Sequence, residues 1–116
     1  MTITTNVTRF LDSRKVKHEV YELPAEKLGA LEAAQILNVP VEQVFKTIVT
    51  KREKGKPVLA VIPGPRVVDL KLLANFLGEK KMHLPTEREA EQLTGLQAGG
   101  ISPLALNNKG FQVVID

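Results

Sequence analysis

A single lysine stands in the apolar stretch VFKTIV, residues 44–49. Lysine is rarely fully buried without a partner, so its position in a predicted strand needs an explanation. Because side chains alternate along a strand, Lys46 shares a face with Ile48, while Thr47 lies on the opposite face with Val49. Position alone leaves two interpretations open: Lys46 reaches water past the end of the sheet, or it lines a pocket in which a bound anion favours its charged form.

The stretch TGLQAGGISP, residues 94–103, is the second candidate for chemistry. Gly99 and Gly100 would let the backbone approach a ligand closely and turn N–H groups towards it, and Pro103 closes the loop. A tight connection without a ligand explains the same residues equally well. The stretch is not a P-loop, since no Gly-Lys-Ser/Thr ending follows. Ser102 has no Gly-x-Ser-x-Gly context, which favours a loop-closing role over a nucleophile.

The remaining polar residues indicate little chemistry. His18 and His83 lie in separate predicted strands, and the chain has no cysteine. The absence of cysteine excludes disulfides, thiolate metal sites and a cysteine nucleophile, so we predict neither a metal nor another cofactor. The acidic residues fall on polar faces or turns, where solvated charge is the expected role.

Length and composition describe one small basic domain. The chain has 116 residues, of which 43% are hydrophobic, and a net charge of +3. This charge permits contact with phosphates but does not require it, because the basic segment KREKGK is typical of a solvated hairpin tip. No apolar run reaches the roughly 18 residues of a membrane span, and no secretory signal is recognisable. We therefore predict a soluble, cytoplasmic protein with no membrane partner.

Predicted helices and strands interleave along the chain, and these elements must position the candidate residues. An amphipathic helix is predicted around residues 3–11, a short strand over KHEVYEL, and a helix over ALEAAQIL that ends near Asn38. VFKTIVTKRE and KPVLAVIP then form a hairpin that we expect to be buried on both faces for much of its length. Its tip is the charged turn around Gly55.

The second half of the chain carries the clearer helix signals. Asp69 is expected to cap a helix with an apolar stripe, and Gly78 to end it. KKMHL is a predicted short strand, Thr86 and Glu89 form a capping-box pattern, and FQVVID is the final strand. The predicted fold is α/β: a single domain over residues 1–116, with a mixed, largely antiparallel β-sheet and flanking helices.

The ordered set VFKTIV, VLAVIPG, DLKLLANFLG and LTGLQAGGISPL resembles the YbaK family of aminoacyl-tRNA deacylases, which also occurs as the editing domain of some prolyl-tRNA synthetases. The resemblance covers nearly the whole chain and implies a YbaK-like fold. It implies that Lys46, followed by Thr47, lies in an editing pocket and that a Gly-x-x-x-Pro loop holds the aminoacyl end of the substrate. The matching loop residues are Gly99, Gly100, Ile101, Ser102 and Pro103.

Further expectations follow from the same resemblance. Tyr21 matches an aromatic residue that lines the pocket. The implied reaction is hydrolysis of the ester of a mischarged tRNA, with Cys-tRNA(Pro) or Ala-tRNA(Pro) as substrates, assisted by a hydroxyl or thiol of the substrate itself. The implied partners are the tRNA acceptor end and prolyl-tRNA synthetase. The family's domain normally continues past the last strand, so this chain is expected to lack the family's C-terminal segment.

Two other functions compete with this hypothesis. A non-catalytic module of the same fold would bind an aminoacyl-tRNA end or a small anion without turnover. A helix-turn-helix DNA binder is suggested by AAQILNVPVEQVFKTI, residues 33–48, although its β-branched end is poor for a recognition helix. The DNA-binding alternative requires helix across Val41 to Thr50.

Overall fold

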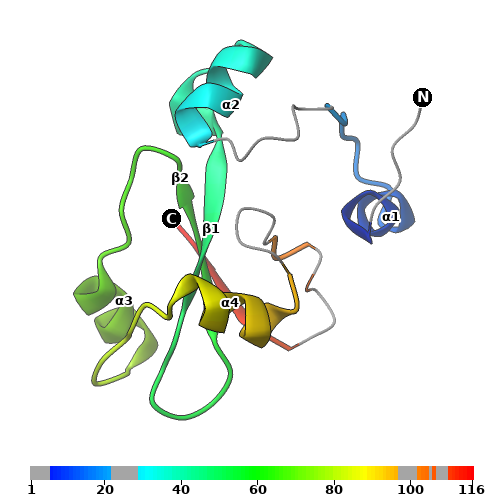
Figure 1. Cartoon of the computed structure of the whole chain (residues 1–116). Helices are drawn as coiled ribbons and strands as arrows, with labels where there is room; N and C mark the ends of the chain where they lie inside the picture. The colour runs from blue at the N-terminus through cyan, green and yellow to red at the C-terminus, as the bar shows by residue number, and fades with distance from the viewer. Residues whose placement is uncertain (1–5, 22–28, 97–101, 105, 107–109) are drawn as a thin grey trace.

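The computed structural model describes residues 6–21, 29–96, 102–104, 106 and 110–116. In the described residues, helices precede a hairpin of two strands, and two further helices separate this hairpin from the last strand (Figure 1). In order, the elements are α1 (Asn6–Ser13), α2 (Ala30–Leu37), the short 3-10 helix η1 (Val41–Gln43), β1 (Phe45–Thr50), β2 (Val58–Pro63), α3 (Leu70–Leu77), α4 (Glu87–Thr94) and β3 (Gln112–Ile115).

The three described strands form one mixed sheet in the order β1-β2-β3. β1 and β2 are the predicted antiparallel hairpin, with Lys46 opposite Ile62 and Thr50 opposite Val58. Gly55 supplies the positive φ of +106° in the turn between them. β3 lies parallel to β2, so the mixed sheet expected from the sequence is confirmed. β2 is the central and most buried strand of the three.

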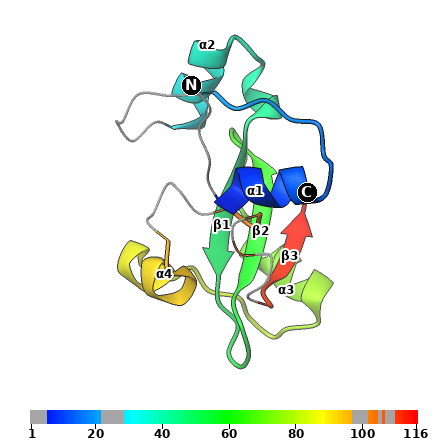
Figure 2. The same cartoon turned by 90° about the vertical axis from the view of Figure 1, so that its right-hand side faces the viewer.

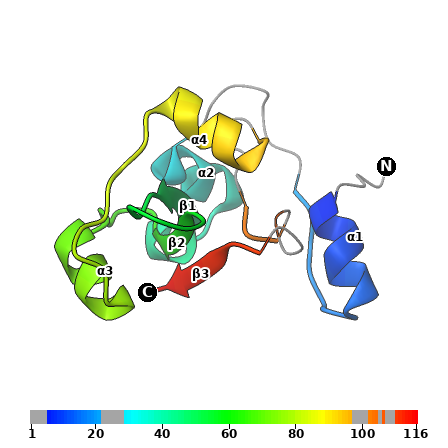
Figure 3. The same ribbon diagram turned by 90° about the horizontal axis from the view of Figure 1, so that it is seen from below.

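Two apolar clusters cover opposite faces of the sheet, because neighbouring strand residues point to opposite sides. On one face, Val58 packs with Leu73 and Ala74 of α3 and with Met82. On the other face, the cluster contains Val49, Leu59 and Leu106, and Ala90 of α4 packs against it. Figure 2 shows α1 in front of the sheet with α3 behind it, and Figure 3, turned by 90°, agrees.

The predicted helix ends are confirmed where their signals are local in the sequence. The Leu72 N–H donates to Asp69 Oδ1 at 3.0 Å and caps α3, and Gly78 ends that helix with a φ of +73°. Thr86 and Glu89 form the full capping box of α4. Asn38 ends α2 in the left-handed conformation. Each of these contacts satisfies backbone groups that a helix end leaves without intrahelical partners.

Two predicted strands are wrong. Residues 16–21, the described part of the segment around KHEVYEL, have no regular secondary structure, and Val20 and Tyr21 are 46% and 60% exposed. No strand pairs with this segment in the part of the chain that the structure describes, so its apolar pair has no sheet to join. KKMHL contributes only an isolated bridge between Lys51 and His83, although its Met82 is buried.

The hairpin is also less buried than expected. Phe45 is half exposed at the start of β1, and burial increases only towards Val49 and Thr50, where the two apolar clusters cover the sheet. The 3-10 turn over Val41–Gln43 and the strand that follows it exclude the continuous helix that a helix-turn-helix would require. The DNA-binding alternative is therefore wrong.

Candidate functional site

Lys46 is the second residue of β1 and is half-buried. Its register partner is Ile62, and by strand alternation its side chain starts on the face that α3 covers. Within the described residues, the Lys46 ammonium has no hydrogen bond or ion pair. A cation that is partly shielded from water and lacks a protein partner is suited to bind an anionic group of a ligand.

Thr47 points to the other face of the sheet, the face of Val49 and Leu59. The chain on both sides of the glycine-rich loop reaches this same face, since Leu96 and Leu106 pack in one cluster with Val49 and Leu59. Val49 is three residues after Lys46, which is roughly 10 Å along a strand. The sheet therefore brings the two ends of the loop close to the strand that carries Lys46 and Thr47.

The last residues of the predicted glycine-rich loop form a local turn. The Leu104 N–H donates to Ser102 Oγ at 3.2 Å, and the Leu106 N–H donates to the Pro103 carbonyl at 3.2 Å. The serine thus makes the contact expected of a loop-closing residue. Gly99, Gly100 and Ile101 lie outside the described residues, so their predicted contact with a ligand stays a prediction.

Tyr21, the predicted aromatic wall of the pocket, is exposed at the end of the first described segment. Its hydroxyl donates to the Glu19 carboxylate. This hydrogen bond, together with the negative charge of Glu19, raises the pKa of the Tyr21 hydroxyl above its ordinary value of 10.0. Within the described residues the polar partner of Tyr21 is therefore Glu19 and not another predicted site residue.

Sequence reasoning missed the role of Gly64, which sets how closely α2 approaches the strands. The Gly64 N–H donates to the Val44 carbonyl at 2.7 Å, two residues before Lys46. A Cβ on Gly64 would lie 2.3 Å from the Cβ of Ala30, the first residue of α2. The only available signal was the composition PGP after β2, which indicates a turn but not a close contact.

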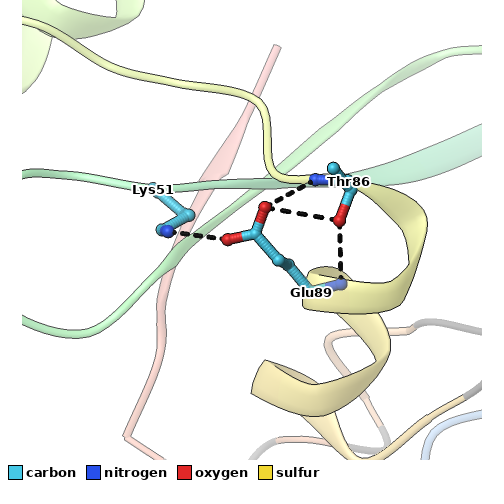
Figure 4. A network of polar contacts seen from close by, with 3 residues as sticks. All are labelled: Lys51, Thr86 and Glu89. Carbon is cyan, nitrogen blue, oxygen red and sulfur yellow. Dashed lines mark hydrogen bonds and ion pairs between the residues drawn. The ribbon is translucent and has the colours of Figure 1, made fainter.

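An ion pair that links β1 to α4 was also missed. Lys51 Nζ donates to Glu89 Oε2 at 2.9 Å, while the other carboxylate oxygen of Glu89 accepts from the N–H and the hydroxyl of Thr86 (Figure 4). The hydrogen bond from Lys51 is the largest cause that lowers the pKa of Glu89 below its ordinary value of 4.5. The two partners are 38 residues apart, so no local sequence pattern predicts their contact.

A hollow of about 390 Å³ lies between α3 and β3, on the sheet face of Lys46. Ala60 and Ile62 of β2 form part of its wall with side chains of α3, and Arg66 and Asp116 are charged residues among those that line it. Leu72 and Phe76 of α3 are 65% and 75% exposed beside it. Asp69 also lines the hollow, but its carboxylate caps α3.

No group of three or more His, Cys, Asp or Glu side chains among the described residues is placed to hold a metal ion. No helix in the same part of the chain has both the length and the apolar character needed to cross a membrane.

The chain matches one protein-family model and several known proteins. Residues 25–116 match the model of the aminoacyl-tRNA editing domain. The chain is 36% identical over 107 residues to EbsC of Enterococcus faecalis, which is named as a candidate Cys-tRNA(Pro)/Cys-tRNA(Cys) deacylase, and the match covers 90% of this chain and 65% of EbsC. It is 37% identical over 90 residues to a proline–tRNA ligase of Desulforamulus reducens, covering 78% of this chain and 15% of the ligase.

Solved structures show the same fold. A protein described as a candidate trans-editing enzyme for prolyl-tRNA synthetase superposes with a TM-score of 0.80 at 30% identity, over 99% of this chain and 74% of that one. A hypothetical protein superposes with a TM-score of 0.86 at 24% identity, over 97% of this chain and 73% of its own, which shows the fold alone. The chain spans just under two thirds of EbsC and a small part of the ligase.

Proposed function

The chain belongs to the family of aminoacyl-tRNA editing domains, and we propose that it hydrolyses the ester bond of mischarged aminoacyl-tRNA in trans. The observation that carries this proposal is the environment of the Lys46 side chain. It is half-buried and without a protein partner in the described residues, on the strand whose apolar side chains hold both ends of the glycine-rich loop. β1 thus carries a cation able to bind an anion on the face that α3 covers, and it holds the two ends of the loop on the opposite face.

In the proposed reaction, water cleaves the bond between the amino acid carbonyl carbon and the ribose oxygen. The products are a free amino acid and a tRNA whose terminal ribose oxygen has regained its proton. Lys46 would hold a phosphate or carbonyl-derived oxygen of the substrate, and backbone N–H groups of the Gly99–Pro103 loop would stabilise the negative charge that develops on the carbonyl oxygen. A hydroxyl or thiol of the substrate assists the attack, and Thr47 and Tyr21 contribute to the walls of the pocket.

The proposed substrates are Cys-tRNA(Pro) and Ala-tRNA(Pro), and the proposed partner is prolyl-tRNA synthetase. The printed name of EbsC supports the cysteinyl substrate. The similarity to a segment of a proline–tRNA ligase, and to a protein described as acting in trans for that synthetase, supports the partner. A pocket that distinguishes amino acids by size needs only one methylene of difference to gain roughly 10- to 200-fold selectivity.

Deacylation of purified Cys-tRNA(Pro) and Ala-tRNA(Pro) tests the proposal. We expect turnover of at least one substrate, and a loss of about 100-fold in Lys46→Ala, the scale observed when one group that stabilises an oxyanion is removed. Lys54→Ala serves as the control, because Lys54 is an exposed lysine of the hairpin turn. The absence of turnover above the Lys46→Ala background with both substrates would refute a deacylase.

A second candidate is a non-catalytic module that binds an aminoacyl-tRNA end or a small anion. It is favoured by the surroundings of Lys46, which has no ion pair with a carboxylate and no hydrogen bond to a base in the described residues. This module would bind a non-hydrolysable aminoacyl-adenosine analogue and show no turnover with either tRNA. Failure to bind the analogue at millimolar concentration would exclude it.

A further inference from the structure

Lys51 and Glu89 connect the two elements on which the proposed site depends. Lys51 follows directly after β1, the strand of Lys46, and Glu89 lies in the first turn of α4, the helix that leads into the glycine-rich loop. Their side chains meet at 2.9 Å and keep 40% and 44% of their surfaces exposed. The close-up in Figure 4 shows Lys51 approaching the Glu89 carboxylate from the hairpin, at the helix end where Thr86 also binds it.

The Glu89 carboxylate has two separate functions in this geometry. Oε1 accepts from the Thr86 N–H at 3.2 Å and closes the capping box, which is internal to α4 and its first turn. Oε2 accepts from Lys51, which directly follows β1. The first contact lies within α4 and its cap, whereas the second joins α4 to the chain that directly follows β1.

Apolar contacts and a backbone bridge also hold this part of the chain, since Lys51 and His83 exchange two backbone hydrogen bonds three residues before Thr86. Ala90 and Leu96 pack against Val49 and Leu59, and Thr94 Oγ1 accepts from the Leu96 N–H at 3.2 Å at the end of the helix. Apolar burial has no preferred direction and allows a short helix to rotate or slide on the surface that it covers. A charge-assisted hydrogen bond is directional, so it can select one orientation of α4 among those that burial allows.

We propose that Lys51 and Glu89 are positioning residues, which set the orientation of α4 and thereby the point at which the glycine-rich loop leaves the helix. This proposal rests on the proposed function, because the loop matters only if it holds substrate. The pair lies at the end of β1 opposite to Lys46 and does not touch the reacting atoms.

Three variants separate the ion pair from the capping box. Lys51→Met removes the cation and keeps a side chain of similar length, while Lys51→Arg keeps the charge. Glu89→Gln removes the anion but keeps an acceptor that a capping box tolerates. Lys54→Met is the matched control, an exposed lysine of the same hairpin turn.

Steady-state deacylation kinetics measure how each variant changes kcat and KM. The pair is partly exposed and positions the loop only indirectly, so Lys51→Met and Glu89→Gln should each lower kcat modestly, by about two- to fivefold, with KM nearly unchanged. Lys51→Arg should restore the activity, and Lys54→Met should have no effect. An unchanged kcat in both pair variants, or an equal loss in Lys54→Met, would overturn the proposal.

Backbone amide NMR shifts provide a measurement that needs no activity. In Lys51→Met, the amide signals of Leu96, Leu104 and Leu106 should move as well as those near Lys51, because α4 leads into this segment. Shifts confined to the hairpin and the first turn of α4 would refute a positioning role. A wild-type protein without deacylation would refute the proposed function alone, since the amide shifts could still respond to Lys51.

Discussion

Lys46 shows how far one residue can be interpreted from its position in a sequence. Its place in a strand was predictable, because apolar and β-branched neighbours define β1. Its lack of a partner among the described residues was not predictable, since that depends on which side chains the fold brings within reach. Within the described residues, the two faces of the sheet carry Lys46 and Thr47 separately, with the loop ends on the Thr47 side.

Contacts between residues close in the sequence were predictable, and contacts between distant residues were not. Asp69 acts on a backbone N–H three residues away, and the capping box of Thr86 and Glu89 has the same spacing. The Lys51 to Glu89 contact spans 38 residues and depends on the packing of α4 against the hairpin. A contact within one helical turn can therefore be predicted from residue spacing, whereas a contact between two elements depends on how they pack.

Glu89 should make the folding stability of the protein depend on pH in the acidic range. Lys51 and the Thr86 N–H lower the pKa of Glu89 in the folded chain below its ordinary value of 4.5. A depressed folded-state pKa contributes stability above the unfolded-state pKa, and this contribution is lost as the pH falls through the folded-state pKa. In thermal melts from pH 7 to pH 3, the advantage of wild type over Glu89→Gln should therefore shrink below about pH 4.5.

The control for this pH series is Glu53→Gln, which removes an exposed carboxylate in the hairpin turn. Its stability should follow wild type through the whole pH range. A constant difference between wild type and Glu89→Gln from pH 7 to pH 3 would show that the ion pair does not contribute to stability.

Elements that contain their own start and end signals were predicted correctly. α3 has its cap, its apolar stripe and its terminal glycine within residues 69–78. The segment around KHEVYEL has strand-like residues but no partner in the described sheet, and it forms no strand over residues 16–21. A strand depends on a neighbour elsewhere in the chain, so residue preference alone does not determine it.

Gly64 determines the packing of one element on another, which a substitution can test. In Gly64→Ala the new Cβ would lie 2.3 Å from the Cβ of Ala30 and 3.0 Å from the Val44 carbonyl oxygen. The start of α2 must move away from the strands, and overpacking of this kind costs about 1–3 kcal/mol. Urea denaturation of wild type and variant measures the difference in the free energy of unfolding.

The second substitution Ala30→Gly separates this clash from other effects of the alanine. It removes the Cβ that Gly64→Ala would meet, so the double variant should recover part of the lost stability. Glycine at a helix position itself costs up to about 1 kcal/mol, and the Ala30→Gly single variant measures that cost. Strictly additive losses in the double variant would mean that the Ala30 contact is not the cause.

At the scale of the whole molecule, the two faces of the sheet have different neighbours. The face of Val58 packs against α3 and borders the hollow, while the face of Leu59 packs against Ala90 of α4 and Leu106. β2 is central to both faces, which explains why Val58 and Leu59 are both fully buried. The mixed sheet was predictable from the order of elements, but which cluster holds the loop was not.

Because the two faces have different neighbours, the same leucine-to-alanine change should affect activity differently on each face. Leu106 and Leu73 are 3% and 8% exposed, so each leucine-to-alanine change should cost about 2–5 kcal/mol of stability. Leu106 belongs to the cluster that holds the end of the glycine-rich loop, whereas Leu73 packs on the α3 side. Under the proposed function, Leu106→Ala should therefore lower kcat for deacylation several-fold more than Leu73→Ala.

The two variants must be compared at a temperature at which both are fully folded, as judged by circular dichroism, so that activity reports geometry and not unfolding. The variant Leu84→Ala is the control, because Leu84 is 56% exposed, does not line the hollow and should change neither stability nor kcat appreciably. Equal losses of kcat in Leu106→Ala and Leu73→Ala would mean that the loop attachment has no special role. A larger loss in Leu73→Ala would instead place the reacting centre on the α3 side, where the hollow opens beside the strand opposite Lys46.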